Sequence, residues 1–363
     1  MIPAIDKIYK VNLGVKKKER VLVFTDCLEE LEECARLVSE RGKFLGFDVS
    51  FLTFEPTGGH GIEPPIEVWQ AAFGKRIMNS FKKEGLIERL LKKEIYTKDL
   101  NLARQIVADK KDEVIDVIIA LSWYSTSHTN FRRLLTINAG TRYASMPLFS
   151  PDMFLGSMDV DWKEIEKISL CLKEMVSQSV IAEICANNGT SLTFNLEGRN
   201  AHADTGILTK KGDFGNLPAG EVYIAPVEGK TEGSLVIEYK ETKKLKEPVT
   251  FEIKDGRVQK TSGDKEATKK FEEIFNKNDL NRNIAELGIG TNPKAKDVTN
   301  VLEAEKILGT IHIALGDNSS FGGNISTPFH EDFVVFNPTL KLKSKEGRIT
   351  TILEDGKFKV RIY

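Results

Sequence analysis

The sequence predicts an α/β protein. Its N-terminal half is expected to hold a mostly parallel sheet with helices on both faces, and its C-terminal half to be an α+β domain with largely antiparallel strands. Up to about residue 160, strand-like and helix-like segments alternate, which is the order that parallel sheets require. After that point short β-rich segments follow one another with turn residues between them. We therefore expect two domains, residues 1–160 and 161–363.

The N-terminal half alternates regularly. Three strands are expected, at 20–26, 48–54 and 114–121. Helical spacing of apolar residues predicts three helices, at 28–46, 63–78 and 130–140. The run 114–121 (VIDVIIAL) is almost continuously apolar, as expected for a strand that is buried on both faces.

The C-terminal half is expected to begin with one long connecting helix over 161–184. Short strands are then predicted within SLTFNLEG, EVYIAPVEG, GSLVIEYK, VTFEIKDGRV and TTILEDGKFKVRIY. The KDG and EDG triplets predict hairpin turns, because Asp-Gly readily adopts positive φ angles. A further helix is expected at 261–277.

Composition argues against two classes of partner. Lysine and arginine (52) nearly equal aspartate and glutamate (53), so no overall positive charge would attract nucleic acid. No apolar run approaches the roughly 20 residues that span a bilayer, and the N-terminal residues do not read as a signal peptide. Four cysteines without a CxxC pair suit free thiols in a reducing compartment. We expect a cytoplasmic protein that binds neither nucleic acid nor membrane.

Carboxylates and histidines occur beside turn glycines in three segments of the C-terminal half. Glu221 begins a strand in GNLPAGEVYIAP, and Glu286 lies among apolar residues in NRNIAELGIGTNP. The third segment holds His312, His330 and Asp332. His330 and Asp332 are two residues apart in a strand-like stretch, so their side chains should point to one face. This set of donors indicates a site for a divalent metal ion, namely Zn²⁺, Co²⁺, Mn²⁺ or Fe²⁺.

Each of these residues also fits a structural role when it is taken alone. Glu221 fits the start of a surface strand, Glu286 a buried ion pair, and His312 a hydrogen-bonded core histidine. The metal-site interpretation rests on their occurrence together. Other chemistry has less support, because the sequence has no Walker GxxxxGK[ST] motif, no GxSxG elbow and no GxGxxG after a strand.

Several segments resemble the thermophilic-type metalloaminopeptidases, the M29 aminopeptidase family. The matching segments are EPPIEVWQA, STSHTNFRRLLTINAGTRYASMP, NLPAGEVYIAPVEGKTEGSLVIE, NIAELGIGTNP, EKILGTIHIALGDN and HEDF. They extend over most of the chain, and NxPxGEV, AELGIGTNP and the final HxD form the most specific set. The resemblance implies a two-domain homodimer whose C-terminal domain carries two divalent metal ions.

The resemblance also implies the ligands of these ions. They carry over to Glu221, Glu286, His312, His330 and Asp332, and Glu305 is the nearest match to one further acid. Glu286 would bridge the ions, and Glu221 would transfer a proton. The implied function is a metallo-aminopeptidase, a hydrolase that removes N-terminal residues from peptides, in which two metal ions activate a bridging water.

One position departs from this family. Active peptidases have a tyrosine seven residues after the first histidine of the motif, where this chain has Ser319. A serine hydroxyl is shorter, so the donor to the oxyanion is either missing or supplied by Asn318 or Asn324. The chain is also shorter than typical peptidase members.

The shorter relatives of this fold indicate a second function. They include a ring-cleaving oxygenase resembling 2,5-dihydroxypyridine dioxygenase, in which one Fe(II) needs two histidines and one carboxylate. His312, His330 and Asp332 meet that requirement. We rank the aminopeptidase first, the Fe(II) dioxygenase second and a non-catalytic binding protein third, with a peptide or a small molecule as the substrate.

Overall fold

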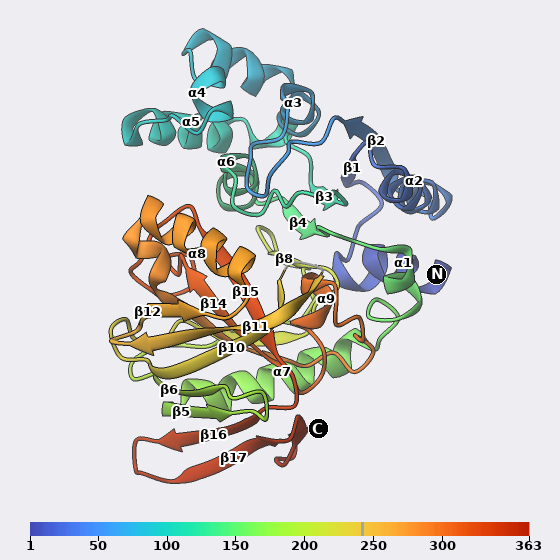
Figure 1. Cartoon of the computed structure of the whole chain (residues 1–363). Helices are drawn as coiled ribbons and strands as arrows, with labels where there is room; N and C mark the ends of the chain where they lie inside the picture. The colour runs from blue at the N-terminus through green and yellow to red at the C-terminus, as the bar shows by residue number, and fades with distance from the viewer. Residues whose placement is uncertain (241–242, 363) are drawn as a thin grey trace. The chain divides into compact units, whose positions relative to one another are not determined.

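The computed structural model describes residues 1–240 and 243–362. The chain divides into two compact units, each formed by two stretches of sequence (Figure 1). The first unit is Met1–Trp162 with Gly206–Pro218, and the second is Lys163–Thr205 with Ala219–Tyr363. The predicted fold class is confirmed, because the sheet of the first unit is parallel and the sheets of the second unit are antiparallel.

The first unit is built on a five-stranded parallel sheet in the order β2-β1-β3-β4-β8. Its strands are β1 (Arg20–Asp26), β2 (Asp48–Phe54), β3 (Val117–Ala120), β4 (Arg142–Ser145) and β8 (Phe214–Asn216). Its helices are α1 (Ile2–Lys7), α2 (Glu29–Phe44), α3 (Ile66–Lys83), α4 (Ile87–Leu91), α5 (Thr97–Asp109) and α6 (Asn130–Arg133). Shorter π or 3₁₀ turns are Ile8–Asn12, Lys111–Glu113, Leu134–Ala139 and Pro151–Leu155.

The alternating pattern of the first half is therefore confirmed. All three predicted strands are present, and so are the three predicted helices, the last of which continues from α6 into the π-helical turn Leu134–Ala139. Consecutive residues of β1 and β3 are buried on both faces of the sheet. Helices on both sides account for this burial, as parallel sheets require.

The second unit contains two antiparallel sheets, in the orders β12-β11-β10-β6-β5-β16-β17-β18 and β15-β14-β13-β9-β7. The strands of the larger sheet are β5 (Ser179–Cys185), β6 (Ser191–Asn195), β10 (Glu232–Lys240), β11 (Lys243–Lys254), β12 (Arg257–Ser262), β16 (Thr339–Ser344), β17 (Ile349–Glu354) and β18 (Lys357–Phe358). Those of the smaller sheet are β7 (His202–Asp204), β9 (Glu221–Ile224), β13 (Ile284–Gly290), β14 (Ile311–Gly316) and β15 (His330–Val335). The helices are α7 (Trp162–Ser177), α8 (Lys265–Lys277), α9 (Val301–Ala304) and the 3₁₀ turn Asp279–Arg282.

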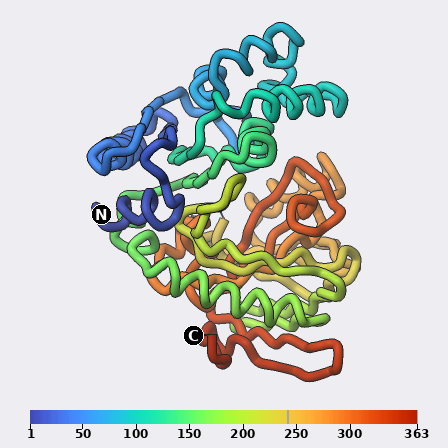
Figure 2. Tube along the Cα trace, turned by 180° about the vertical axis from the view of Figure 1, so that it is seen from behind, coloured from blue at the N-terminus to red at the C-terminus, as the bar shows by residue number. Residues whose placement is uncertain are grey.

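The long connecting helix predicted over 161–184 is wrong at its C-terminal end. α7 runs along the second unit (Figure 2) but ends at Ser177, and the following residues form β5. β5 pairs with both β6 and β16. The apolar residues of SVIAEIC fit a helical period as well as a strand period, so tertiary pairing determines their conformation.

The two hairpin turns predicted from Asp-Gly are present. Asp255 and Asp355 have φ angles of 51° and 48°, and the glycines that follow them are also in the left-handed region. Each pair joins two neighbouring antiparallel strands, β11 to β12 and β17 to β18. These turns fix the register of the larger sheet at two places.

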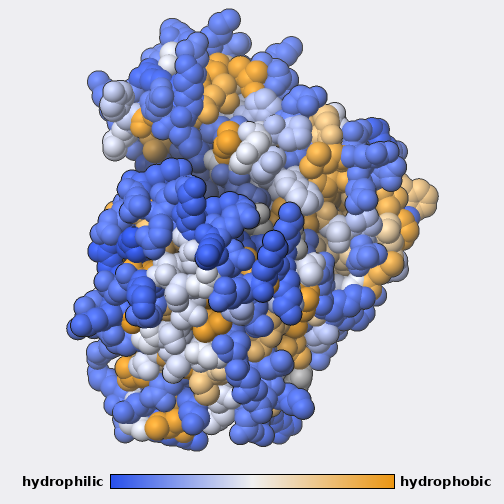
Figure 3. All heavy atoms as spheres, viewed as in Figure 1, coloured by the Kyte–Doolittle hydropathy of each residue, from blue (hydrophilic) through white to orange (hydrophobic). Residues whose placement is uncertain are grey.

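Aromatic side chains form part of the core of the second unit. The ring of Phe251 on β11 contacts Phe271 of α8 and Phe333 of β15 edge to face, with centroids 5.0 and 5.8 Å away. Because Phe333 lies on the smaller sheet, this cluster holds the two sheets and α8 together. The face shown in Figure 3 is mostly hydrophilic, with apolar residues in small groups. No helix in the described part of the chain is long and apolar enough to cross a bilayer.

The N-cap of α8 provides a test of this packing. The Asp264 carboxylate accepts hydrogen bonds from the backbone N–H groups of Glu266 and Ala267, both at 3.0 Å. We expect Asp264→Ala to lower the free energy of unfolding by about 1 kcal/mol, measured by urea denaturation. Lys269→Ala, on the exposed side of the same helix, is the control. Equal stabilities of the two variants would contradict the capping role.

Candidate metal centre

The smaller sheet of the second unit carries five of the six predicted ligands on one face. Glu221 lies on β9, Glu286 on β13, His312 on β14, and His330 with Asp332 on β15. Ala314 on β14 lies opposite Glu286 on the neighbouring strand β13 and opposite Asp332 on the other neighbour, β15. Since side chains two residues apart share a face, these ligands point to the same side of the sheet.

A glycine on β13 makes room for one of the histidines. Gly288 pairs with His312 on the neighbouring strand. A Cβ atom at Gly288 would lie 1.9 Å from Nε2 of the His312 imidazole, well inside van der Waals contact. The imidazole therefore lies directly over the backbone of Gly288, and only glycine permits this arrangement.

Hydrogen bonds join the two sequence motifs that carry Glu221 and Glu286. Asn292 Nδ2 donates to the Ala219 carbonyl at 2.9 Å, and the Thr291 N–H donates to the Gly220 carbonyl at 2.8 Å. Gly220 has a φ of +118°, and a Cβ there would lie 2.8 Å from Cβ of Asn292. The NLPAGEV and GIGTNP segments thus meet. This contact fixes the N-terminal end of β9, where Glu221 lies.

The side chains converge around Glu286. His312 Nε2 lies 3.3 Å from Oε1 of Glu286 and 3.2 Å from Oε2 of Glu221. His330 Nε2 lies 3.7 Å from Oε2 of Glu286 and 3.6 Å from Oδ2 of Asp332. Glu286 therefore contacts both histidines, and the structure brings the predicted residues together.

A lysine that the sequence analysis did not identify completes one side of the cluster. Lys306 is fully buried, and its ammonium lies 2.8 Å from Glu221 and 2.5 Å from Glu305. Glu305, the sixth predicted ligand, follows α9 and lies in the cluster through this contact. Burial would lower the pKa of Lys306, but Glu221 and Glu305 raise it, so its positive charge is maintained.

The electrostatics of the cluster favour added positive charge. Burial alone would lower the pKa of His330, but the neighbouring Asp332 and Glu286 raise it to about 10. Burial would raise the pKa of Glu221, but Lys306 and His312 lower it to about 2. Burial raises the pKa of Glu305 to about 8, against the influence of Lys306. Imidazoles that take up protons so readily can instead ligate a metal cation, which would supply the same compensation.

The donor atoms fall into three overlapping groups, each compact enough to hold a metal ion. They are Glu221, Glu286 and His312; Glu286, His330 and Asp332; and Glu305, His312 and Asp332. Asp332 belongs to the groups of both histidines, so it connects His312 to His330. Imidazole nitrogens with carboxylate oxygens form a donor set that suits divalent transition metals.

The orientation of His330 also suits metal binding. Its Nδ1 lies 2.8 Å from the backbone carbonyl of Asp317, which can accept only if Nδ1 carries the proton. In the neutral ring Nε2 then has the free lone pair, and this atom faces Glu286 and Asp332. A carbonyl that fixes the ring in this way is the usual outer support of a metal-bound histidine. The residues therefore fit a metal ion.

Other sequence expectations have a different outcome. Asn318 and Asn324, considered as oxyanion donors, both direct their side-chain amides to Glu228. Ser319 is exposed, and its hydroxyl donates a hydrogen bond to Oδ1 of Asp317 at 3.0 Å. None of these contacts points to the oxyanion role, because the donors already bond Glu228 and Asp317.

Two further residues on the ligand face were also missed. Asp204 pairs with Glu221, and Tyr223 pairs with Gly288, so both belong to the same face as the ligands. The i, i+2 spacing of Glu221 and Tyr223 within one strand is a sequence signal that identifies the tyrosine. Lys306 has no such signal, because a lysine next to a glutamate ordinarily indicates a solvated surface.

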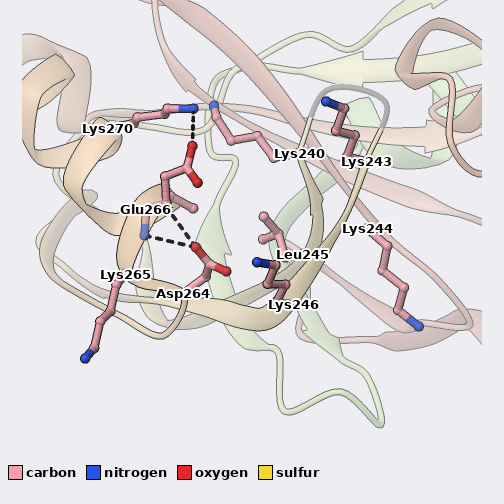
Figure 4. Close-up of a pocket in the computed structure, with 10 residues that line it drawn as sticks. Lys240, Lys243, Lys244, Leu245, Lys246, Asp264, Lys265, Glu266 and Lys270 are labelled. Atoms are coloured by element: carbon pink, nitrogen blue, oxygen red, sulfur yellow. Dashed lines mark hydrogen bonds and ion pairs between the residues drawn. The ribbon is translucent and has the colours of Figure 1, made fainter.

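The second unit has a hollow that lies outside the ligand face. It has a volume of about 520 Å³ and is lined by Lys240, Lys243, Lys244, Lys246, Lys265 and Lys270, with Leu245, Asp264, Glu266 and Ala267 (Figure 4). The Lys240 ammonium donates a hydrogen bond to the carboxylate of Glu331. Glu331 lies between His330 and Asp332 on β15, so its side chain points to the opposite face of that strand. This lysine-rich hollow is therefore separate from the metal centre.

Comparison with known proteins identifies the family of the chain. The family model NicX, 2,5-dihydroxypyridine 5,6-dioxygenase, matches residues 114–359, about two thirds of the chain. The chain belongs to this family. The matched region includes every residue of the metal centre. No curated protein sequence matches the chain.

Two solved structures share the fold. The 2,5-dihydroxypyridine dioxygenase from Pseudomonas putida KT2440 matches with a TM-score of 0.71 and 15% identity, over 99% of this chain and 97% of that chain. AmpT from Thermus thermophilus, an M29 aminopeptidase, matches with a TM-score of 0.59 and 14% identity, over 99% of this chain and 98% of that chain. At these identities the two likenesses demonstrate a common fold.

The function ranked first from the sequence is therefore wrong. The chain is a member of a dioxygenase family, so the assignment to hydrolases, as a metalloprotease or aminopeptidase, does not hold. The resemblance to the M29 family reflected the shared fold. The second-ranked function, a dioxygenase of the 2,5-dihydroxypyridine type, agrees with the family and with the more similar structure.

Gly288 offers a test of the ligand geometry. We expect Gly288→Ala to displace the His312 imidazole and to weaken metal binding by roughly 10- to 100-fold, because the added methyl occupies the position of the ring. Metal content after dialysis against Co²⁺ would measure this. Gly59→Ala, a glycine with ordinary φ in the first unit, is the control. Metal binding equal to that of the unmodified protein would show that His312 is not a ligand in this position.

Lys306 offers a second test. We expect Lys306→Met to lower the free energy of unfolding of the metal-free protein at pH 7 by about 3–5 kcal/mol, because the buried, ionised Glu221 loses its cation. The folded pKa of Glu221, about 2, lies below its ordinary value of 4.5. The stabilisation is therefore present above pH 4.5 and is lost as the pH falls towards 2.

Urea denaturation of both proteins between pH 7 and pH 3 would measure this difference. The difference in free energy of unfolding between the unmodified protein and Lys306→Met should become smaller towards pH 3. The exposed variant Lys269→Met should have the stability of the unmodified protein at every pH. A gap that stays constant with pH would contradict the pairing of Lys306 with an ionised Glu221.

Proposed function

We propose that the chain is a mononuclear Fe(II) dioxygenase that opens the ring of 2,5-dihydroxypyridine or a closely similar dihydroxylated nitrogen heterocycle. The observation that carries this proposal is the occurrence of two histidines and one carboxylate on adjacent strands of a member of the 2,5-dihydroxypyridine 5,6-dioxygenase family. Two histidines and one carboxylate form the ligand set of many non-haem Fe(II) oxygenases.

His312, His330 and Asp332 would hold the iron. Bound Fe(II) supplies the redox chemistry with O₂ that the cleavage of an aromatic ring needs. The Asp317 carbonyl keeps His330 Nε2 directed to the ligand face. Gly288 gives His312 its place over β13. These residues fix the ligand positions before substrate binds, which is the main contribution of a protein to such a site.

Lys306 supports a site for one metal ion. Its ammonium occupies the side of the cluster formed by Glu221 and Glu305. A second dication on that side would meet the like charge of a buried ammonium, which is costly in a medium of low dielectric constant. The histidine side, with Asp332 and Glu286, has no such cation among the contacts described above.

Glu286 is the base that we assign to the reaction. Its two carboxylate oxygens face His312 and His330, so it lies beside the ligands. A hydroxyl of the bound ring at this place can transfer its proton to Glu286, and loss of that proton makes the ring more electron-rich. Glu221, held by Lys306 and His312, then has an orienting role for His312.

The metal content and oxygen uptake test this proposal. After anaerobic reconstitution with Fe²⁺ we expect about one iron per chain, and one O₂ consumed per 2,5-dihydroxypyridine. His312→Ala, His330→Ala and Asp332→Ala should each lose iron and reduce oxygen uptake by more than about a hundredfold. Glu183→Gln, an exposed acid on β5 in the other sheet, is the control.

Two outcomes would contradict the proposal. One is the binding of two metal ions per chain with no oxygen uptake in the iron form. The other is iron binding that survives the loss of either histidine. The homodimer and the cytoplasmic location remain predictions, and the mass of the native protein in solution would test the first of them.

A further inference from the structure

The segment between β14 and β15, residues 317–329, is held in place by one carboxylate. Glu228 accepts hydrogen bonds from Asn318 Nδ2 at 3.0 Å and from the Asn324 N–H at 2.7 Å. Arg199 pairs with Glu228 and also donates to the Gly322 carbonyl. These contacts bind both arms of the loop to the same acid, so the loop has a defined shape.

Interactions inside the loop add to this order. The side chain of Asn318 is fully buried, and its Oδ1 accepts from the Ile325 N–H at 2.9 Å. A Cβ at Gly323 would lie 1.9 Å from the Asn318 side chain, so the loop closes tightly around this amide. A buried and fully bonded asparagine is typical of a structural loop anchor.

This loop carries Phe321 to the metal centre. The ring of Phe321 lies edge to face against His330, with centroids 6.0 Å apart, and against Tyr223, with centroids 5.5 Å apart. Tyr223 in turn stacks on His202 at 5.4 Å. Four rings thus follow one another along the ligand face, and the last of them is a predicted iron ligand.

The centre is open to solvent on the side where Phe321 lies. The side chains of His330 and Asp332 are 20% and 22% exposed, whereas that of His312 is 1% exposed. A substrate that reaches the metal from solvent therefore arrives beside His330. Phe321 contacts that imidazole, so its ring lies next to this exposed side of the centre.

We propose that Phe321 is a specificity-determining residue, whose ring, together with Tyr223, packs against the planar aromatic ring of the substrate beside His330. The inference rests on the proposed function and identifies the part of the site that selects a flat ring. Aromatic rings attract one another in stacked and edge-to-face arrangements. A peptide chain at the same place would set its polar groups against these rings without hydrogen-bond partners.

Anaerobic calorimetry tests the inference without turnover. 2,5-Dihydroxypyridine is titrated into the Fe²⁺ protein in the absence of O₂, and into the Zn²⁺ protein as a redox-inactive form. We expect Phe321→Ala and Phe321→Leu to weaken binding by roughly three- to tenfold, and Phe321→Tyr to retain it. Metal content should stay the same in all variants. Ser319→Ala, an exposed neighbour in the same loop, is the control and should bind as the unmodified protein does.

The outcomes separate this inference from the proposed function. Unchanged binding in Phe321→Leu would overturn the role of the ring, and so would failure of the unmodified protein to bind the heterocycle at all. Ring binding that depends on Phe321, in a protein that consumes no O₂, would support the inference and would contradict the proposed dioxygenase activity.

Discussion

The candidate metal centre depends on the register of the four strands β9, β13, β14 and β15. In antiparallel sheets a shift of one residue moves every side chain to the opposite face. Here the pairs Gly288–His312 and Ala314–Asp332 set that register, and glycine or alanine opposite each ligand leaves space for it. The predicted ligands come from positions 221 to 332, so their approach is a property of the sheet and not of any local segment.

The sequence allowed much of this arrangement to be predicted. Apolar periodicity gave the order of elements in the first half, and the alternation of His330 and Asp332 indicated a shared face, because both signals are local. The end of α7 was wrong because SVIAEIC suits two conformations. The helix α5 and the short strands β4 and β8 were not predicted. Strands of three or four residues have too few positions to display a period.

The reaction was harder to predict than the clustering of the candidate ligands. Carboxylates and imidazoles of the same types can hold two hydrolytic ions or one redox-active iron, so the residue inventory agrees with both. What differs lies around the ligands. Lys306 is an unremarkable lysine in the sequence, yet in the fold it is the counter-charge of two buried acids. Likewise Asn318 and Asn324 are needed to shape a loop, which only their contacts with Glu228 reveal.

The path of the chain through residues 206–218 affects how the protein can be made and divided. This stretch interrupts the second unit between β7 and β9, and it supplies β8, the edge strand that pairs with β4 in the first unit. During synthesis the first sheet stays incomplete until residue 216 has left the ribosome. A chain cut after residue 162 would expose the edge of β4 and invite pairing with other molecules. The first unit therefore cannot complete its sheet until part of the second unit has been synthesised, although each unit has its own core.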